Sequence, residues 1–306
     1  MVPFRIGLAG AGRMGRNHMA AIAASEHVAV TAIAEPVEAT RQEMADSGAK
    51  VYDSLESMVN AGGIDGVIVC VPSDQHLQTV RRLVGARLPI LCEKPLGVSA
   101  AEAREASGLA EQARIPLQIG FWRRFVPSLR RLRARIEQGE LGEIYQVGCY
   151  QWDGVPPGVA FRAHSGGIFI DMGVHEFDQA RWLTGQEFES VEAMDSGVAL
   201  EPWPGDPESA QALGRMSGGS TTIVSLGRRF PLGDVCKVEV HGTRDWEEVR
   251  FLWPPDADAV FMAALRNQAE SFAHYARGGS LQGAGGRDVT EAVVAAESAA
   301  AASGKS

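Results

Sequence analysis

Residues 4–15 read FRIGLAGAGRMG, a short apolar run followed by a glycine-rich turn. The turn, GAGRMG at residues 10–15, matches the pattern G-x-G-x-x-G, which is typical of dinucleotide-binding domains when it follows a strand and opens a helix. In such domains the first glycine permits a tight turn, the second lets a pyrophosphate approach the backbone, and the third allows close packing of the helix on the strand. The alternative is a turn that serves packing alone. The residues expected to contact a cofactor here are Gly10, Gly12, Arg13, Met14 and Gly15.

The first 120 residues alternate between strand-like and helix-like segments. Near-continuous apolar runs are typical of parallel strands buried on both faces, and they occupy residues 5–9, 28–34, 66–71 and 89–92. Amphipathic segments separate them, at residues 16–25, 37–48, 55–61, 75–85 and 100–114. This alternation predicts an α/β fold, with a Rossmann-type doubly wound parallel sheet in an N-terminal domain over residues 1–120. The glycine motif therefore stands in the context that dinucleotide binding requires.

An acidic residue closes the second predicted strand. Glu35 lies 25 positions after Gly10, near the place where a carboxylate holds the adenosine ribose of NAD. Because a carboxylate there would repel the 2′-phosphate of NADP, Glu35 predicts NAD as the cofactor. Arg13 and Arg41 are the nearby cations that could favour NADP instead.

Two further predicted strands end in polar segments. Ligands lie at the carboxyl ends of strands in open α/β sheets, so we expect Pro72, Ser73 and His76 beside the cofactor, with His76 starting a helix rather than acting in catalysis. The next strand runs into CEKPL at residues 92–96. Here we predict that Lys94 is catalytic and partly buried near the nicotinamide, and that Glu93 contacts the cofactor and fixes the lysine backbone. The alternative is a solvated lysine in an ordinary turn.

The pattern changes after residue 120. Residues 128–139 form an arginine-rich helix, but Leu129, Leu132 and Ile136 recur at helical spacing, which indicates one packed face and one solvated face rather than a nucleic-acid site. Strand-like segments follow with little helix between them, at residues 144–152, 191–200, 220–226, 235–241 and 249–253. They predict a substrate-binding α+β domain over residues 121–306 with a mainly antiparallel sheet. Residues 203–208 are expected to form a loop and residues 288–303 a helix.

The most informative stretch of this half is SGGIFIDMGVHEFD at residues 165–178. Asp171, His175 and Asp178 are spaced to share one face of a helix, and we expect that face to lie outside the core. A carboxylate one turn from an imidazole can orient it and raise its pKa, which would suit His175 to move a proton near neutral pH. A metal site is the competing interpretation, but Gln179 stands where the pattern H-E-x-x-H needs its second histidine, so no metal is expected. An exposed polar face is the remaining alternative.

Composition excludes several classes of function. A chain of 306 residues with a formal net charge of −9 is a poor candidate for general nucleic-acid binding. No apolar run approaches the roughly 18 residues of a membrane span, and the N-terminus lacks the pattern of a secretory signal. The four cysteines are widely spaced and form no C-x-x-C pair, which argues against a disulfide framework. We therefore expect a cytoplasmic protein that binds neither nucleic acid nor membrane.

The motifs at residues 10–15, 93–95 and 166–175, in this order and at these separations, resemble those of the glucose-fructose oxidoreductase/inositol dehydrogenase/MocA (Gfo/Idh/MocA) family over nearly the whole chain. Residues 120–125 (GFWRRF) and 165–178 look most like those of bacterial inositol 2-dehydrogenases. The resemblance implies a Rossmann domain, a C-terminal open-sheet domain, and a homodimer or homotetramer. It also implies a cis Lys94–Pro95 bond and a catalytic set of Lys94, Asp171 and His175.

The reaction implied by the resemblance is NAD-dependent oxidation of a ring hydroxyl of a cyclic polyol, with conversion of myo-inositol to the 2-keto inositol as the first expectation. His175 would accept the hydroxyl proton, Asp171 would hold its tautomer, and Lys94 would favour the developing alkoxide. The residues implied to contact substrate are Lys94, Gln118, Arg124, Met172, His175 and Asp178. Met172 stands where inositol enzymes tend to have a small polar residue. Another inositol isomer, an aldose or a keto sugar therefore remains an alternative, as does a non-catalytic regulator that senses a dinucleotide.

Overall fold

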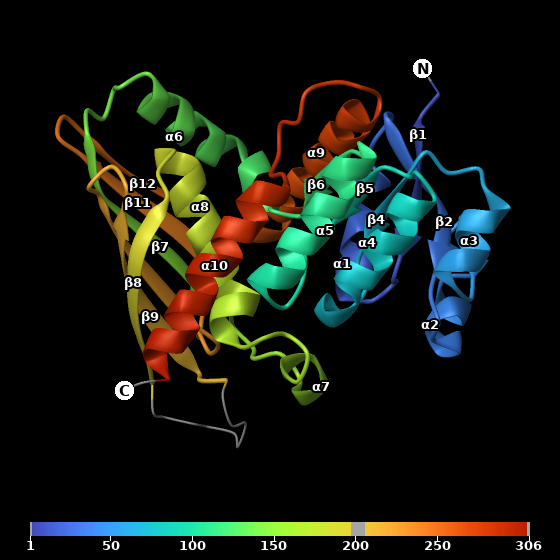
Figure 1. Cartoon of the computed structure of the whole chain (residues 1–306), viewed down its shortest axis with the longest axis horizontal. Helices are drawn as coiled ribbons and strands as arrows, with labels where there is room; N and C mark the ends of the chain where they lie inside the picture. Colours follow the sequence, from blue (N-terminus) through green and yellow to red (C-terminus); the bar gives the residue numbers. More distant parts are fainter. Residues whose placement is uncertain (1, 197–205, 305–306) are drawn as a thin grey trace. The chain divides into compact units, whose positions relative to one another are not determined.

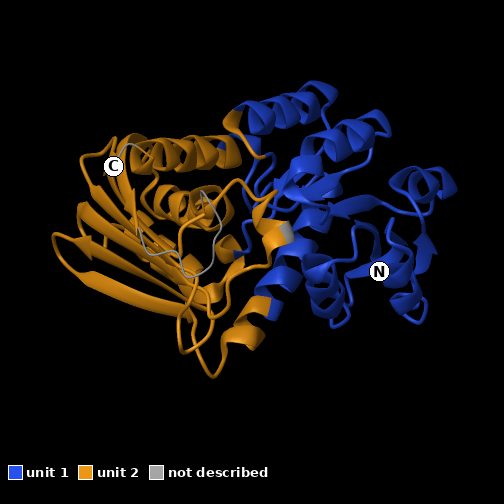
Figure 2. Cartoon of the chain, turned by 90° about the horizontal axis from the view of Figure 1, so that it is seen from below, with its two compact units in different colours: residues 1–97, 101–122, 262–287 blue, residues 98–100, 123–261, 288–306 orange. Residues whose placement is uncertain are grey.

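Two units make up the chain in the computed structural model, which describes residues 2–196 and 206–304 (Figure 2). Unit 1 comprises Met1–Gly97, Ala101–Trp122 and Met262–Arg287, and unit 2 comprises Val98–Ala100, Arg123–Phe261 and Asp288–Ser306. The predicted boundary at residue 120 lies close to the break after Trp122. The predicted assignment of residues 121–306 to one domain differs from the structure, because residues 262–287 belong to unit 1.

Unit 1 is built on a six-stranded sheet in the order β3-β2-β1-β4-β5-β6, in which every neighbouring pair is parallel (Figure 1). This is the strand order of a doubly wound Rossmann sheet, so the predicted fold class of this part of the chain is confirmed. The strands are β1 (Phe4–Ala9), β2 (Val28–Ala34), β3 (Lys50–Tyr52), β4 (Gly66–Val69), β5 (Ile90–Cys92) and β6 (Leu117–Ile119). The helices are α1 (Arg13–Ile22), α2 (Glu38–Glu43), α3 (Leu55–Ala61), η1 (Ser73–Gln75), α4 (His76–Gly85) and α5 (Ala100–Ala113), with α9 (Ala257–Ala276) belonging to this unit from Met262 onward.

The core of unit 1 explains why residues 262–287 join it. The central strands are buried on both faces, as their continuous apolar runs predict, and every residue of β4 is buried. Phe272 of α9 is fully buried in the same apolar cluster as Phe4 and Ile6 of β1. The rings of Phe4 and Phe272 meet edge to face, with their centroids 5.8 Å apart. The late helix therefore completes the core of the N-terminal sheet.

Unit 2 contains a six-stranded mixed sheet in the order β12-β11-β7-β10-β9-β8. Only β7 and β10 pair in parallel, and the other neighbouring pairs are antiparallel, which confirms the predicted mainly antiparallel sheet. The strands are β7 (Ile144–Trp152), β8 (Phe188–Asp195), β9 (Ser209–Met216), β10 (Thr221–Gly227), β11 (Val235–Gly242) and β12 (Trp246–Leu252). The helices are η2 (Trp122–Phe125), α6 (Pro127–Glu137), α7 (Val159–Arg162), the π-helical turn η3 (Phe169–Gly173), α8 (Val174–Thr184) and α10 (Gly286–Ser303).

Helices cover one face of the second sheet. α8 packs on β7 and β10, and α6 packs on α8 and β12, so both helices lie on the same face (Figure 1). Leu129 and Leu132 of the predicted packed face of α6 are buried, whereas Ile136 is only partly buried. On the other face of the sheet Tyr145, Met194 and Leu213 are more than half exposed. This face therefore presents large apolar side chains to solvent.

Two predicted segments of unit 2 include residues that the structure does not describe. The strand predicted at residues 191–200 starts earlier, at Phe188, and residues 197–200 lie outside the described part of the chain. Residues 203–205, half of the loop predicted at residues 203–208, also lie outside it.

Candidate active site

The glycine-rich turn connects β1 to α1, and its three glycines have different surroundings. Gly10 has a φ of +92°, and a Cβ on it would lie 2.7 Å from the carbonyl oxygen of Cys70. A Cβ on Gly15 would lie 2.2 Å from the carbonyl oxygen of Gly10. In contrast, no described atom lies within 4 Å of a Cβ built on Gly12, which caps the N-terminus of α1. The open space at Gly12 fits the close approach of a pyrophosphate to the backbone at the start of the helix.

Glu35 ties the end of β2 to this turn. Its side chain is buried, Oε2 accepts a hydrogen bond of 2.8 Å from the backbone N of Ala11, and Oε1 accepts one of 2.9 Å from the backbone N of Val37. Arg41 donates from Nη1 to the carbonyl oxygens of Glu35 and Pro36, at 2.9 and 2.7 Å. The carboxylate therefore lies beside the glycine turn, where a ribose would meet it, and the Arg41 cation is held at the same strand end.

The loop after β5 carries Lys94, and the Lys94–Pro95 peptide bond is cis, as the family resemblance implies. His76, the first residue of α4, is buried beside this loop. Its Nδ1 lies 2.5 Å from the carbonyl oxygen of Pro95, and its Nε2 lies 3.0 Å from the carbonyl oxygen of Val71. Burial lowers the pKa of His76, and the two carbonyl contacts oppose that shift. The imidazole thus joins the loop after β4, which contains Pro72 and Ser73, to the loop that carries the lysine.

A buried pair that sequence reasoning missed supports the same loop. His18 of α1 is fully buried and donates from Nε2 to Oε1 of Glu93 at 2.7 Å. Oε2 of Glu93 accepts a hydrogen bond of 3.3 Å from the backbone N of Lys94. A Cβ on Gly120 would lie 2.7 Å from Glu93 Oε2, so glycine at position 120 leaves room for the carboxylate. The position of His18, three residues after Gly15, is the only local signal for this contact.

Gln118 of β6, expected to contact substrate, has a structural partner inside unit 1. Its side chain is fully buried, and Nε2 donates to the carbonyl oxygen of Gln268 on α9 at 3.1 Å. The residue therefore joins β6 to α9 inside unit 1.

The segment with Asp171 and His175 lies in unit 2. Asp171 belongs to the π-helical turn η3, and His175 follows in the first turn of α8. Insertions that make a π-helical turn are frequent at functional sites. The expectation that this helix face lies outside the core is wrong, because every residue of α8 from Val174 to Leu183 is buried. Met172 is buried as well, with a relative exposure of 2%.

Arginines compensate the buried acids of α8. Arg124 contacts Asp178 through two hydrogen bonds, Nε to Oδ2 at 2.9 Å and Nη2 to Oδ1 at 2.5 Å, and Nη2 also lies 3.0 Å from Oδ1 of Asp288. Burial raises the pKa of the Asp178 carboxyl, and Arg124 opposes that shift. Arg123 pairs with Glu176 through one contact, from Nη1 to Oε1. The charged groups of Arg124 and Asp178, both expected to contact substrate hydroxyls, face each other in this structure.

Arg228 is a second residue that sequence reasoning missed. It follows β10 directly, and its side chain is fully buried. Nη1 donates to Oδ2 of Asp171 at 3.3 Å, and Nη2 donates to Oδ1 of Asp206 at 3.0 Å. No local pattern distinguishes it from the arginine that follows it, because its partners are 57 and 22 residues away in the sequence.

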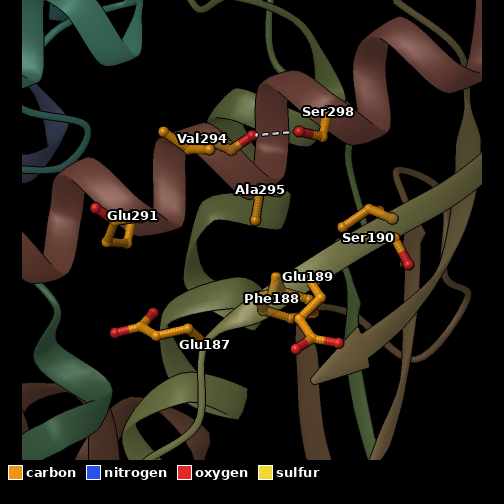
Figure 3. Close-up of a pocket in the computed structure, with 9 residues that line it drawn as sticks. Glu187, Phe188, Glu189, Ser190, Glu291, Val294, Ala295 and Ser298 are labelled. Atoms are coloured by element: carbon orange, nitrogen blue, oxygen red, sulfur yellow. Dashed lines mark hydrogen bonds between the residues drawn. The ribbon is translucent and has the colours of Figure 1, made fainter. Parts of the chain in front are cut away.

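A separate hollow lies in unit 2. The hollow lies between β8 and α10 (Figure 3). Its cavity volume is about 120 Å³, and the predicted site residues are not among the described residues that line it. Residues 2–196 and 206–304 contain no group of three or more His, Cys, Asp or Glu side chains that could hold a metal ion. In that same part of the chain, each helix is too short or too polar to cross a membrane.

Comparison with known proteins matches both halves of the chain to one family. Residues 4–121 match the family described as "Oxidoreductase family, NAD-binding Rossmann fold", and residues 129–246 match the GFO/IDH/MocA C-terminal domain. The Rhizobium meliloti rhizopine catabolism protein MocA is 50% identical over 98% of this chain and 95% of its own length. An inositol 2-dehydrogenase from Rhizobium meliloti strain 1021 is 32% identical over 78% of this chain and 73% of its own length.

The structural comparison agrees with the sequence comparison. The crystal structure of a putative myo-inositol dehydrogenase from Sinorhizobium meliloti 1021 superposes with a TM-score of 0.92 at 29% identity, covering 99% of this chain and 98% of the other. The family matches, the two relatives from Rhizobium meliloti and the solved structure all indicate the same family of oxidoreductases. The chain is an NAD-using oxidoreductase and belongs to the Gfo/Idh/MocA family.

Proposed function

We propose that this enzyme oxidises a ring hydroxyl of a cyclic polyol, and that it converts myo-inositol to the 2-keto inositol. The observation that carries the proposal is the placement of three residues. Lys94 lies in the loop after β5 of unit 1. In unit 2, Asp171 lies in the π-helical turn η3 and His175 lies in the first turn of α8 that follows it. Relatives named as inositol dehydrogenases, at 28–34% identity, support the substrate class.

The dinucleotide would be held by residues of unit 1. The open backbone at Gly12 and the N-terminus of α1 suit the pyrophosphate, and the carboxylate of Glu35 suits the adenosine ribose. The remaining residues proposed to contact NAD are Gly10, Arg13, Met14, Gly15, Pro72, Ser73, His76, Glu93 and Lys94. Bound NAD supplies the acceptor for the hydride that leaves the carbinol carbon.

The side chains of this protein provide proton transfer and charge stabilisation. His175 accepts the proton of the substrate hydroxyl as that carbon becomes a ketone. Asp171 holds the imidazole in the required tautomer and stabilises the imidazolium that forms. The ammonium of Lys94 binds the same hydroxyl oxygen and favours the developing alkoxide. Met172, next to Asp171, is proposed to border the polyol.

A second substrate candidate rests on a specific comparison. The relative named for rhizopine catabolism is 50% identical to this chain, whereas the inositol 2-dehydrogenase from a strain of the same species is 32% identical. We therefore include rhizopine among the candidate substrates, together with scyllo-inositol, an aldose and the corresponding keto sugars.

The test is a substrate panel with NAD and with NADP, followed by the absorbance of the reduced cofactor. We expect turnover of at least one inositol or rhizopine with NAD, and at least about tenfold lower kcat/KM with NADP because of Glu35, which corresponds to about 1.4 kcal/mol. Tight NAD binding without turnover of any polyol or sugar would contradict the proposal and favour a regulator that senses a dinucleotide.

We further propose that the enzyme acts in the cytoplasm as a homodimer or homotetramer. All four cysteines are free thiols, which fits a reducing compartment. The exposed face of the second sheet, with Tyr145, Met194 and Leu213, is the surface proposed to pair with a second copy. Light scattering on the eluting protein measures the mass, and a monomer at micromolar concentration would contradict this assembly.

A further inference from the structure

We propose that Arg228 is a positioning residue that holds Asp171 for catalysis. The inference rests on the proposed function, in which Asp171 orients His175. The Arg228 guanidinium lies between two carboxylates, with Nη1 3.3 Å from Oδ2 of Asp171 and Nη2 3.0 Å from Oδ1 of Asp206. The Arg228 side chain is fully buried, and that of Asp171 is 12% exposed. A planar guanidinium has donors on both terminal nitrogens, Nη1 and Nη2, and can therefore hold two carboxylates at a fixed spacing.

Asp206, the second carboxylate that Arg228 contacts, is held by a partner other than Asp171. Asp206 also faces Arg162, whose Nε lies 3.3 Å from Oδ2 of Asp206, and each of these two side chains is only 2% exposed. Glu208 lies 3.7 Å from the same arginine. Buried charges are stable only when they are paired, so this chain of ions restricts where Arg228 can lie. The position of Arg228 in turn restricts Asp171.

The charges around Asp171 also support a positioning role for Arg228. Asp153, in the loop after β7, has a raised pKa because of burial and the nearby carboxylates of Asp234 and Asp171, and Arg228 opposes the shift. Arg228 is thus a cation among several carboxylates of unit 2. If Arg228 were replaced by a neutral residue, the Asp171 carboxylate would lose this counter-charge and would be repelled by the neighbouring carboxyl of Asp153. We expect the Asp171 side chain to turn towards solvent or another partner as a result. We expect the imidazolium of His175 to lose its stabilising carboxylate in that case.

The test is a double-mutant cycle at Asp171 and Arg228 in the full-length protein. R228M should lower kcat by about 10-fold to 100-fold, the range found for residues that orient metal-binding side chains, with little change in KM for the polyol. In an Asp171→Asn background, R228M should cost less than about threefold, because residues that act as a unit have non-additive effects. R228K should recover part of the lost activity, since one ammonium supplies the charge but cannot span both carboxylates.

The control is Arg181→Gln. Arg181 is another buried arginine of unit 2, and it pairs with Glu187 and donates to the carbonyl oxygen of Asp288 rather than to Asp171. Arg181→Gln should lower the melting temperature and leave kcat within about twofold. If R228M does not fold, R228K and Asp206→Asn carry the test, because Asp206→Asn keeps the shape of the second anchor and should also lower kcat.

Three outcomes separate the possibilities. Normal kcat in R228M, with a large loss in Asp171→Asn, would overturn the role of Arg228 while leaving the proposed function intact. Equal losses of kcat in R228M and Arg181→Gln would also overturn it, because the effect would then be structural. Normal kcat in Asp171→Asn would instead refute the role of Asp171 in the proposed function, and the inference on Arg228 would fail with it.

Discussion

Nε2 of His18 donates a hydrogen bond of 2.7 Å to Oε1 of Glu93, and both side chains are buried in unit 1. The pair connects α1, which begins at the glycine turn, to the loop that carries Lys94. Since Glu93 also accepts a hydrogen bond from the backbone N of Lys94, the helix that would receive the pyrophosphate and the proposed catalytic lysine share one buried contact. A disturbance of His18 should therefore affect both stability and catalysis.

His18→Ala is predicted to lower the free energy of unfolding by about 3 kcal/mol, because it leaves the buried Glu93 carboxylate without its histidine partner. Urea unfolding followed by circular dichroism measures this, and His27→Ala at an exposed position of the same unit is the control. We also expect a lower kcat, because the Lys94 backbone loses a fixed neighbour. An unfolding free energy equal to that of the control would show that the pair contributes nothing to stability.

Substitutions at two glycines of the same turn should separate binding from folding. Gly12→Ala meets open space, so the melting temperature should stay within about 2 °C, while the Kd for NAD rises at least about tenfold because the added methyl group occupies the path of the pyrophosphate. Gly15→Ala places a Cβ 2.2 Å from a carbonyl oxygen and should cost about 1–3 kcal/mol of stability. Calorimetric titration with NAD and thermal unfolding distinguish the two effects. Unchanged NAD affinity in Gly12→Ala would argue against pyrophosphate binding at this turn.

His76 is predicted to make stability depend on pH. The ordinary pKa is 6.5, and burial lowers the pKa in the folded protein. Above pH 6.5 the imidazole is neutral in both states, and its full contribution to stability is present. As the pH falls below 6.5 the unfolded chain takes up the proton first, so stability is lost as the pH falls through the folded-state pKa, by up to about 1.4 kcal/mol per pH unit.

His76→Gln should remove this part of the pH dependence. The measurement is the free energy of unfolding of both proteins between pH 7.5 and 5, and the difference between them isolates His76 from the other titrating groups. Parallel curves for the two proteins would contradict the prediction.

The ion pair of Arg124 and Asp178 is predicted to stabilise the fold rather than to bind substrate. Arg124→Met leaves a buried carboxylate without its main partner and should cost about 3–5 kcal/mol, because the two side chains are only 6% and 3% exposed. Arg82→Met, which removes a half-exposed pair with Glu56, should cost at most about 1 kcal/mol. A normal stability of Arg124→Met together with a raised KM for the polyol would instead support the contact with substrate hydroxyls.

The Rossmann sheet could be predicted because its continuous apolar runs and its glycine turn are local signals. The strands that sequence reasoning missed are short or have weak β-propensity. β3 and β6 have three residues each, and β9 buries Ala210, Ala212 and Gly214, small residues that are not typical of strands. The return of α9 to unit 1 depends on the contact of Phe272 with Phe4, which are far apart in the sequence.

In the candidate site, too, local patterns could be predicted from the sequence, whereas contacts between residues far apart in the sequence could not. Lys94 and His175 lie in local patterns whose chemistry can be read from neighbouring residues. The pairing of Arg228 with Asp171 and of His18 with Glu93 depends on residues 57 and 75 positions apart. One sequence indicates which residues are charged but does not indicate which distant charge lies beside each of them.

The central claim, that Lys94 acts in catalysis, is tested most directly by Lys94→Ala. Stopped-flow or steady-state kinetics give kcat, and calorimetry gives the Kd for NAD, with Lys50→Ala at an exposed position of unit 1 as the control. We predict that kcat falls at least about 100-fold, because the developing alkoxide loses its cation, while the Kd for NAD changes less than about threefold. A near-normal kcat in Lys94→Ala would contradict the account.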